Sequence, residues 1–271
     1  MLERGPTYSR PGSADEADCA GGESCDFVVM LVLYLGWYAL HRAFWSVPKA
    51  DNSLQALTIA FPNLAGVGLP IASSVLGPAG TVPIAVALAA GCILVSPLSL
   101  IVVEMSAAQE HSVGISSAAR IVGALRRAVT KPVVLAPALG ILLSLSELRL
   151  GSVLEACLML IGHSAAGVAL FLTGLVLSAQ PFRLNWRIIA ATWTADIIRP
   201  LLTAGLVWNL PIANEVARTA ILIAAVPSGF FGILFAVSYR LDSTTPSSMV
   251  FASRALSIAT MAIAIAYLFP G

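Results

Sequence analysis

Two prolines and two glycines interrupt an otherwise apolar, uncharged run, Ala60-Phe61-Pro62-Asn63-Leu64-Ala65-Gly66-Val67-Gly68-Leu69-Pro70. Each proline removes a backbone donor and clashes with the carbonyl four residues earlier, so a helix is expected to break here. The run Ala225-Val226-Pro227-Ser228-Gly229-Phe230-Phe231-Gly232 repeats this pattern. Because backbone groups released in lipid need partners from protein or water, both breaks are predicted to line a cavity or to lie inside a helix bundle.

The composition of the whole chain indicates a membrane protein. Of its 271 residues, 58% are hydrophobic and 11% are charged, whereas roughly 25% are charged in a typical soluble domain. The charged residues are absent from long apolar runs rather than thinned evenly along the chain. The net charge of +1 provides no basic field for a phosphate backbone, so nucleic acid is not an expected partner.

Eight apolar segments meet or approach the length needed to cross a bilayer. A hydrocarbon core about 30 Å thick needs roughly 20 residues of helix. Helices are expected because every backbone group in lipid must be paired within the protein. The predicted segments are 27–45, 54–76, 82–103, 132–148, 153–179, 186–208, 217–237 and 247–268.

Lys and Arg are distributed unevenly between the connections on the two sides of these segments. One set of connections carries nine basic residues, whereas the opposite set carries only Arg149 and Arg218. The positive-inside rule places the first set in the cytoplasm and both termini outside. Residues 1–26 are expected to form a disordered acidic tail, and residues 106–131 the main cytoplasmic loop. The predicted location is the cell inner membrane, with multiple spans.

The paired breaks point to a binding site. Interrupted helices in the two halves of a chain are the best sequence indication of a secondary transporter's site at the middle of the membrane. Asn63 and Ser228 each follow the helix-breaking proline directly, and their side chains can hydrogen-bond a carboxylate. The alternative is that both prolines are ordinary kinks, which are common in membrane helices.

The motifs resemble those of the auxin efflux carrier family. The run from Phe61 to Pro70 is similar to the proline-asparagine and glycine-x-proline run in the family's fourth helix. Further matches follow in the family's order: Gly167 to Leu175 with Gln180-Pro181, the stretch 224–236 around Pro227, and Ala255-Leu256-Ser257. The resemblance implies an all-α integral membrane fold of ten helices in two inverted repeats, similar to bile-acid sodium symporters. In that fold the fourth and ninth helices are broken and cross at the substrate site.

The resemblance also implies which parts of the chain form the transport bundle and which form the scaffold. Residues 27–105 and 182–271 would hold the transport-bundle helices of the two repeats, and residues 132–181 the scaffold helices. Eight segments instead of ten imply that the family's first two helices are missing, through a misassigned start or a genuine truncation. Family members carry small organic anions, so a mono- or dicarboxylate substrate is implied. The predicted substrate-binding residues are Pro62, Asn63, Gly66, Gly68, Pro227, Ser228 and Arg254.

Charged residues inside the predicted spans are further candidates. Asp196 and Arg199 are spaced i, i+3 and share a helix face. At mid-bilayer an ionised residue costs about 2.5 to 3.5 kcal/mol on insertion scales. The functional interpretation makes Asp196 a proton-coupling carboxylate and Arg199 its release partner or an anion-attracting charge. The alternative is a structural pair that faces the bundle. Arg254 either pairs with a substrate carboxylate or extends to the cytoplasmic surface. Glu104, at the end of its segment, is expected to be solvated.

Other functions lack the motifs they require. The chain has no Walker A run, no HExxH pair and no nucleophile beside a base, so an enzyme is not expected. Its four cysteines show no metal-ligand spacing, and neither a metal nor another cofactor is predicted. The sequence therefore predicts a secondary carrier whose partners are a small organic anion, H⁺ or Na⁺, and the bilayer. A second copy of the chain, in a homodimer, is left open as a further partner. The alternative function is that of a truncated, non-transporting membrane subunit or an inactive remnant, and a membrane enzyme is less favoured.

Overall fold

The computed structural model describes residues 13–77, 80–111, 117–146 and 151–270, which form helices and short connections. In chain order these are α1 (Ser13–Phe44), α2 (Lys49–Ala60), η1 (Leu64–Gly68), α3 (Leu69–Val75), α4 (Thr81–Ala90), η3 (Gly91–Val95), α5 (Ser96–His111), α6 (Ser117–Val129), α7 (Pro132–Leu145), α8 (Ser152–Ser178), α9 (Trp186–Trp193), η4 (Thr194–Ile198), α10 (Arg199–Trp208), α11 (Asn214–Ala225), α12 (Phe231–Ser238) and α13 (Thr244–Leu268). The three η elements are π-helical turns. The predicted all-α membrane fold is confirmed.

Each predicted segment corresponds to one helix or to an interrupted helix. Among the described residues, four helices are long and apolar enough to cross a membrane: Ser24–Phe44, Thr81–Ala107, Ser152–Ser178 and Thr244–Leu268. A fifth span results if Ile121–Val129 and Pro132–Leu145, which meet at 61°, are counted together. The eight spans predicted from the sequence are therefore reached only if each broken helix is also counted as one span.

Two stretches that we expected to be irregular contain helix. Residues 13–26, assigned to a disordered tail, form the first turns of α1, while residues 1–12 lie outside the described part of the chain. Gly22 lies so close to α11 that an added Cβ would meet the Val216 side chain at 2.5 Å. Packing of small residues against α11 thus stabilises a helix in residues 13–26, although their composition is polar. Within the expected loop 106–131, α5 continues to His111 and α6 begins at Ser117.

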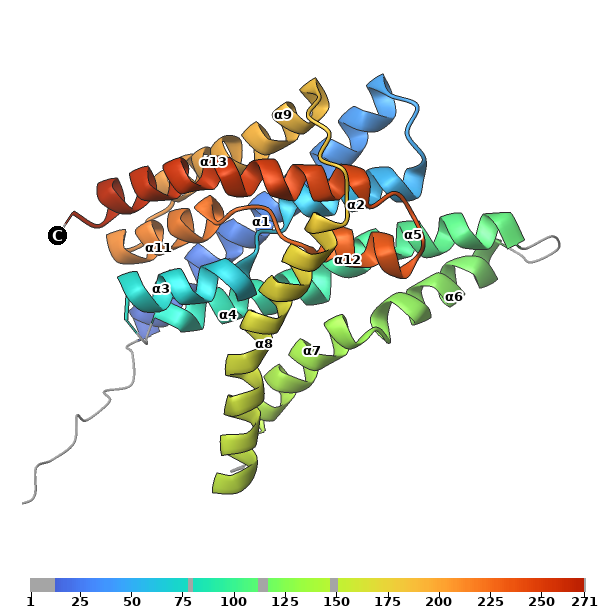
Figure 1. Ribbon diagram of the computed structural model, residues 1–271. Helices are drawn as coiled ribbons and strands as arrows, with labels where there is room; N and C mark the ends of the chain where they lie inside the picture. Colours follow the sequence, from blue (N-terminus) through green and yellow to red (C-terminus); the bar gives the residue numbers. More distant parts are fainter. Residues whose placement is uncertain (1–12, 78–79, 112–116, 147–150, 271) are drawn as a thin grey trace, which may run out of the picture.

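Most helices form one bundle, from which α8 projects (Figure 1). The start of α1 and the end of α13 lie at the same end of this bundle (Figure 1), which we call the terminal end. The end of α5 and the start of α9 lie at the opposite end of the bundle (Figure 1). Only 6% of the apolar window of α8 is buried, so its surface is available to lipid or to another chain.

The core of the bundle is densest where the broken helices meet. Leu54, Leu57 and Phe61 of the first broken helix are fully buried, as are Leu222 and Ile223 of the second. Burying a large apolar side chain contributes about 1.5 to 3 kcal/mol. This packing holds both breaks inside the protein, where their backbone groups can find partners other than lipid.

Candidate functional site

The two broken helices cross at their breaks. Pro62 and Ser228 form an isolated antiparallel bridge. The backbone N–H of Asn63 donates to the carbonyl of Pro227 at 2.8 Å, and that of Gly229 donates to the carbonyl of Phe61 at 2.9 Å. The predicted crossing is thus confirmed, and it satisfies backbone groups that each break releases.

Glycines allow this close approach. A Cβ added to Gly229 would lie 2.5 Å from the carbonyl oxygen of Phe61. A Cβ added to Gly232, at the start of α12, would lie 2.6 Å from the carbonyl oxygen of Leu54 and would collide with the Thr58 hydroxyl. Because these neighbours lie in α2 or directly after it, the two broken helices can approach this closely only where a side chain is absent.

Asn63 caps the helix that begins after the first break. Its Oδ1 accepts a hydrogen bond from the backbone N–H of Gly66 at 3.1 Å, and its carbonyl accepts from Val67 and from Gly68. The residue is only 2% exposed. Its Nδ2 is buried and has no hydrogen-bond partner in the described part of the chain. An unpaired buried donor costs about 1 to 3 kcal/mol, so this atom is suited to a ligand that brings an acceptor.

The second break is held by residues from other helices. The backbone N–H of Ser228 donates to the Ser253 hydroxyl on α13 at 2.9 Å. That hydroxyl donates in turn to Asp196 Oδ1 on η4 at 2.7 Å. Asp196 is 1% exposed, and its Oδ2 has no hydrogen-bond partner among the residues described.

Arg199 binds the ends of both broken helices. Its Nε donates to the carbonyl of Ala224 at 2.8 Å and one Nη to the carbonyl of Ile59 at 2.8 Å, while the other Nη donates to the carbonyl of Val226. The last carbonyls of a helix lack intrahelical partners and carry the negative end of its dipole. A buried guanidinium therefore satisfies the C-terminal ends of α2 and α11 together.

This arrangement differs from the pair that i, i+3 spacing suggested. Across the described ranges, no ion pair or hydrogen bond joins Asp196 to Arg199. The Arg199 side chain instead bonds to carbonyls that are 25, 27 and 140 residues away in the sequence. Three carbonyl acceptors in fixed positions outcompete one carboxylate on its own helix.

Arg254 lies on α13, directly after Ser253. Its Nε and one Nη are buried without a hydrogen-bond acceptor in the part of the chain that is described. Two unpaired cationic donors have the chemistry that a carboxylate requires.

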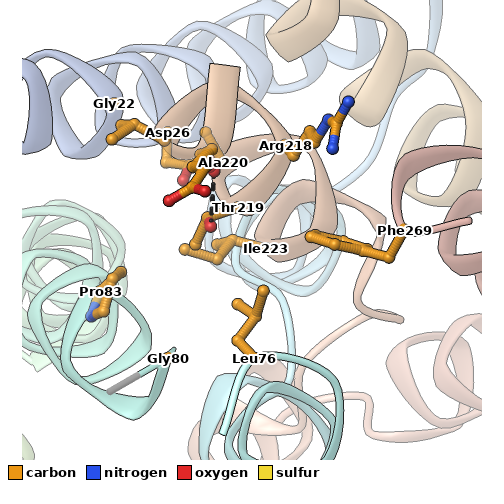
Figure 2. A pocket seen from close by; sticks show the side chains of 12 residues that line it. Gly22, Asp26, Leu76, Gly80, Pro83, Arg218, Thr219, Ala220, Ile223 and Phe269 are labelled. Carbon is orange, nitrogen blue, oxygen red and sulfur yellow. Dashed lines mark hydrogen bonds between the residues drawn. The ribbon is translucent and has the colours of Figure 1, made fainter. Parts of the chain in front are cut away.

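A cavity of about 410 Å³ enters the bundle at the terminal end. Figure 2 shows it between Asp26 of α1, Leu76 after α3, and Thr219 and Ile223 of α11. Ile223 lies in the last turn of α11, which ends at Ala225, two residues before Pro227. The cavity therefore reaches the end of the helix that leads into the second break.

Polar contacts join helices at the opposite end. Glu104 accepts a hydrogen bond from Arg127 Nε at 2.5 Å and another from the Tyr239 hydroxyl at 2.5 Å. Burial, then the neighbouring Glu104 carboxylate, raises the pKa of Tyr239, so the phenol stays a donor. The expectation that Glu104 is solvated is wrong: only 7% of the residue is exposed. No sequence pattern indicates these contacts, because the partners lie 23 and 135 residues away.

Comparison with known proteins places the chain in a family. The profile of the family described as "Membrane transport protein" matches residues 25–265. The chain belongs to this family, that of the auxin efflux carriers. It is therefore a multi-pass membrane transporter rather than an enzyme.

Curated relatives agree with this assignment. The protein is 24% identical over 222 residues to the "Uncharacterized transporter YfdV" of Escherichia coli (strain K12), which covers 80% of this chain and 68% of the relative. Proteins of the same name from Escherichia coli O157:H7 and Shigella flexneri match with the same identity and coverage. None of these names states a substrate.

Proposed function

We propose that the protein is a secondary carrier for a small organic anion such as a mono- or dicarboxylate, and that the helix crossing is its substrate site. The observation that carries this proposal is the buried Nδ2 of Asn63, which has no acceptor among the described residues. The proposed site comprises Pro62, Asn63, Gly66, Gly68, Pro227, Ser228 and Arg254.

The helix ends at the crossing favour an anion over a cation. Each broken helix presents one C-terminal and one N-terminal end there. Arg199 occupies carbonyls at both C-terminal ends. The N-terminal ends of Leu64–Val75 and Phe231–Ser238 keep their partial positive charge, which attracts a carboxylate. In this proposal Asp196 couples transport to an ion, and Arg199 fixes the crossing.

The two ends of the bundle differ in a way that fits a carrier whose site opens to each side of the membrane in turn. The cavity at the terminal end reaches the last turn of α11, whereas at the opposite end Glu104 of α5 bonds to Arg127 of α6 and to Tyr239. Rigid-body motion of the crossing bundle would break the contact between Glu104 and Arg127, because α6 lies outside that bundle, and would open the site to the other side. The exposed α8 would then contact lipid or, in a homodimer, a second copy of the chain.

Counterflow in proteoliposomes tests the proposal. The full chain would be reconstituted with one unlabelled mono- or dicarboxylate inside, and the same labelled anion would be added outside. We expect exchange of at least one anion and none of its amide analogue. Asn63→Ala should weaken its affinity by roughly 10- to 100-fold, or about 1.4 to 2.8 kcal/mol. Failure of every anion to exchange would contradict the proposal.

The same counterflow assay distinguishes the carrier from a second candidate function, that of a non-transporting membrane subunit. A non-transporting membrane subunit is favoured by the uncovered surface of α8, which is typical of a helix that packs against another chain. Such a subunit would bind its partner but would show no counterflow on its own.

Cysteine labelling tests the proposed orientation in the inner membrane. If the termini lie outside, Thr130→Cys should react only with reagent added from the cytoplasmic side, because basic residues surround it. Asn214→Cys, near the cavity, should react only from outside. The reverse pattern would contradict the orientation and leave the site assignment unaffected.

A further inference from the structure

Ser253 connects the two polar groups nearest the second break. It is fully buried in α13 and was not among the predicted site residues. A backbone N–H can only donate, so the direction of the bond from Ser228 to Ser253 Oγ is fixed. The hydroxyl hydrogen of Ser253 is then free to bond Asp196 Oδ1. One hydroxyl thus joins η4, α13 and the break between α11 and α12.

The surroundings of Asp196 suit a group that gains and loses a proton. Its Oδ2 is buried and has no hydrogen-bond partner in the described part of the protein. Arg199, on the same helix, acts on Asp196 through its field but bonds to carbonyls instead. Asp26 on α1 acts electrostatically on Arg199, and α13 contributes the Ser253 hydroxyl. A carboxylate without a direct counter-charge binds a proton more readily when another negative charge approaches.

We propose that Ser253 is a positioning residue that transmits the protonation state of Asp196 to the substrate site, which makes H⁺ the coupling ion. While Asp196 is ionised, the Ser253 hydroxyl donates to it. When Oδ1 of Asp196, the oxygen that faces Ser253, takes up H⁺ from solvent, the new Oδ1–H group donates to Ser253 Oγ. No other covalent bond forms or breaks. Ser253 Oγ still accepts from Ser228, because a hydroxyl oxygen accepts two hydrogen bonds.

Protonation therefore releases the hydroxyl hydrogen of Ser253. This hydrogen can turn towards an anion at the crossing, where the Ser228 backbone already lies within hydrogen-bond distance of Ser253. Binding of H⁺ and binding of the anion then favour each other, and by linkage the effect is reciprocal. A proton fits this site better than Na⁺, because the carbonyls at the C-terminal helix ends, which coordinate Na⁺ in transporters with broken helices, already accept hydrogen bonds from Arg199, whereas a proton needs only one carboxylate oxygen.

The inference rests on the proposed function. One of its two tests therefore uses no substrate, so that it can succeed or fail independently of transport. Infrared spectroscopy of the full chain would follow the carboxylic acid band of Asp196 as a function of pH, with Asp196→Asn identifying the band. Ser253→Ala should shift both the band and its titration midpoint. Ser253→Thr, which keeps the hydroxyl, should preserve both. Ser257→Ala is the matched control, since among the described residues that hydroxyl bonds to the Arg254 carbonyl on its own helix and to no other group.

The second arm uses proteoliposomes. Ser253→Ala should lose accumulation driven by a pH gradient by roughly tenfold or more and should lose substrate counterflow by a smaller factor, and Ser253→Thr should restore both. If Ser253→Ala does not fold, Asp196→Asn must show the same loss of accumulation with counterflow retained. The inference is overturned if Ser253→Ala accumulates anion as the unmodified protein does, or if counterflow and accumulation fall together and Thr restores neither. A Ser253-dependent titration without transport of any anion would contradict the proposed function, but would leave the link between Asp196 and Ser253 intact.

Discussion

The two broken helices keep their breaks in shape by different means. The first break is capped from within, because Asn63 accepts hydrogen bonds from Gly66, Val67 and Gly68, which follow it in the chain. The second break is held from outside, by Arg199 of α10 and Ser253 of α13. A self-capped break can keep its geometry when neighbouring helices move, whereas a break held from outside changes with them. The difference suggests a division of labour, with recognition at the first break and coupling at the second.

Removal of Arg199 should have the largest effect, because it frees the second break and also the end of α2. Arg199→Ala leaves three buried carbonyls without their donor, so the free energy of unfolding should fall by about 3 kcal/mol or more. Thermal unfolding in detergent measures the change. Arg218→Ala, at an exposed position on α11, should stay within about 0.5 kcal/mol of the unmodified protein. Equal stability of the two variants would mean that Arg199 does not hold the breaks together.

Gly229→Ala tests the contact between the two breaks. Its Cβ would meet the carbonyl oxygen of Phe61 at 2.5 Å, so overpacking should cost about 1 to 3 kcal/mol and push the helices apart. Gly205→Ala is the control, since nothing lies within 4 Å of its added Cβ. That substitution should be neutral or slightly stabilising in thermal unfolding. A destabilised Gly205→Ala beside an unchanged Gly229→Ala would contradict the observed crossing.

Tyr239→Phe should have the smallest effect, confined to the second broken helix. It removes the hydrogen bond to Glu104 just beyond α12 and should cost about 0.5 to 1.5 kcal/mol locally. Amide hydrogen exchange in α12 should therefore speed up by roughly two- to tenfold, while exchange in α3 stays unchanged. Tyr267→Phe, at a position 87% exposed, serves as the control. Equal acceleration in α3 and α12 would show that the two broken helices open as one unit.

The sequence was most informative where a residue dictates its own backbone. The prolines of the two breaks predicted the interrupted helices, because proline breaks a helix in almost any surroundings. Their crossing was implied by the resemblance to the auxin efflux carrier family. The Asp196–Arg199 pair was a weaker prediction, because i, i+3 spacing says which side chains are near but not which acceptors lie on other helices. The helical start of α1 depended on packing against α11, which composition does not reveal. Ser253 was not predicted, because the sequence does not show which hydroxyl the fold brings to the Ser228 backbone from another helix.

The central claim is that the crossing binds an organic anion through the unpaired donor of Asn63. Asn63→Asp tests it most directly, since Asp caps a helix as well as Asn does but replaces the Nδ2 donor with a second oxygen. Asn185→Asp is the matched control: Asn185 caps α9 in the same way, with Oδ1 accepting from the Ile188 N–H at 3.0 Å. With an anion that the counterflow assay identifies, equilibrium binding should weaken by tenfold or more in Asn63→Asp, at about 1.4 kcal/mol per decade, and stay unchanged in Asn185→Asp. Unchanged affinity in a folded Asn63→Asp variant would contradict the account.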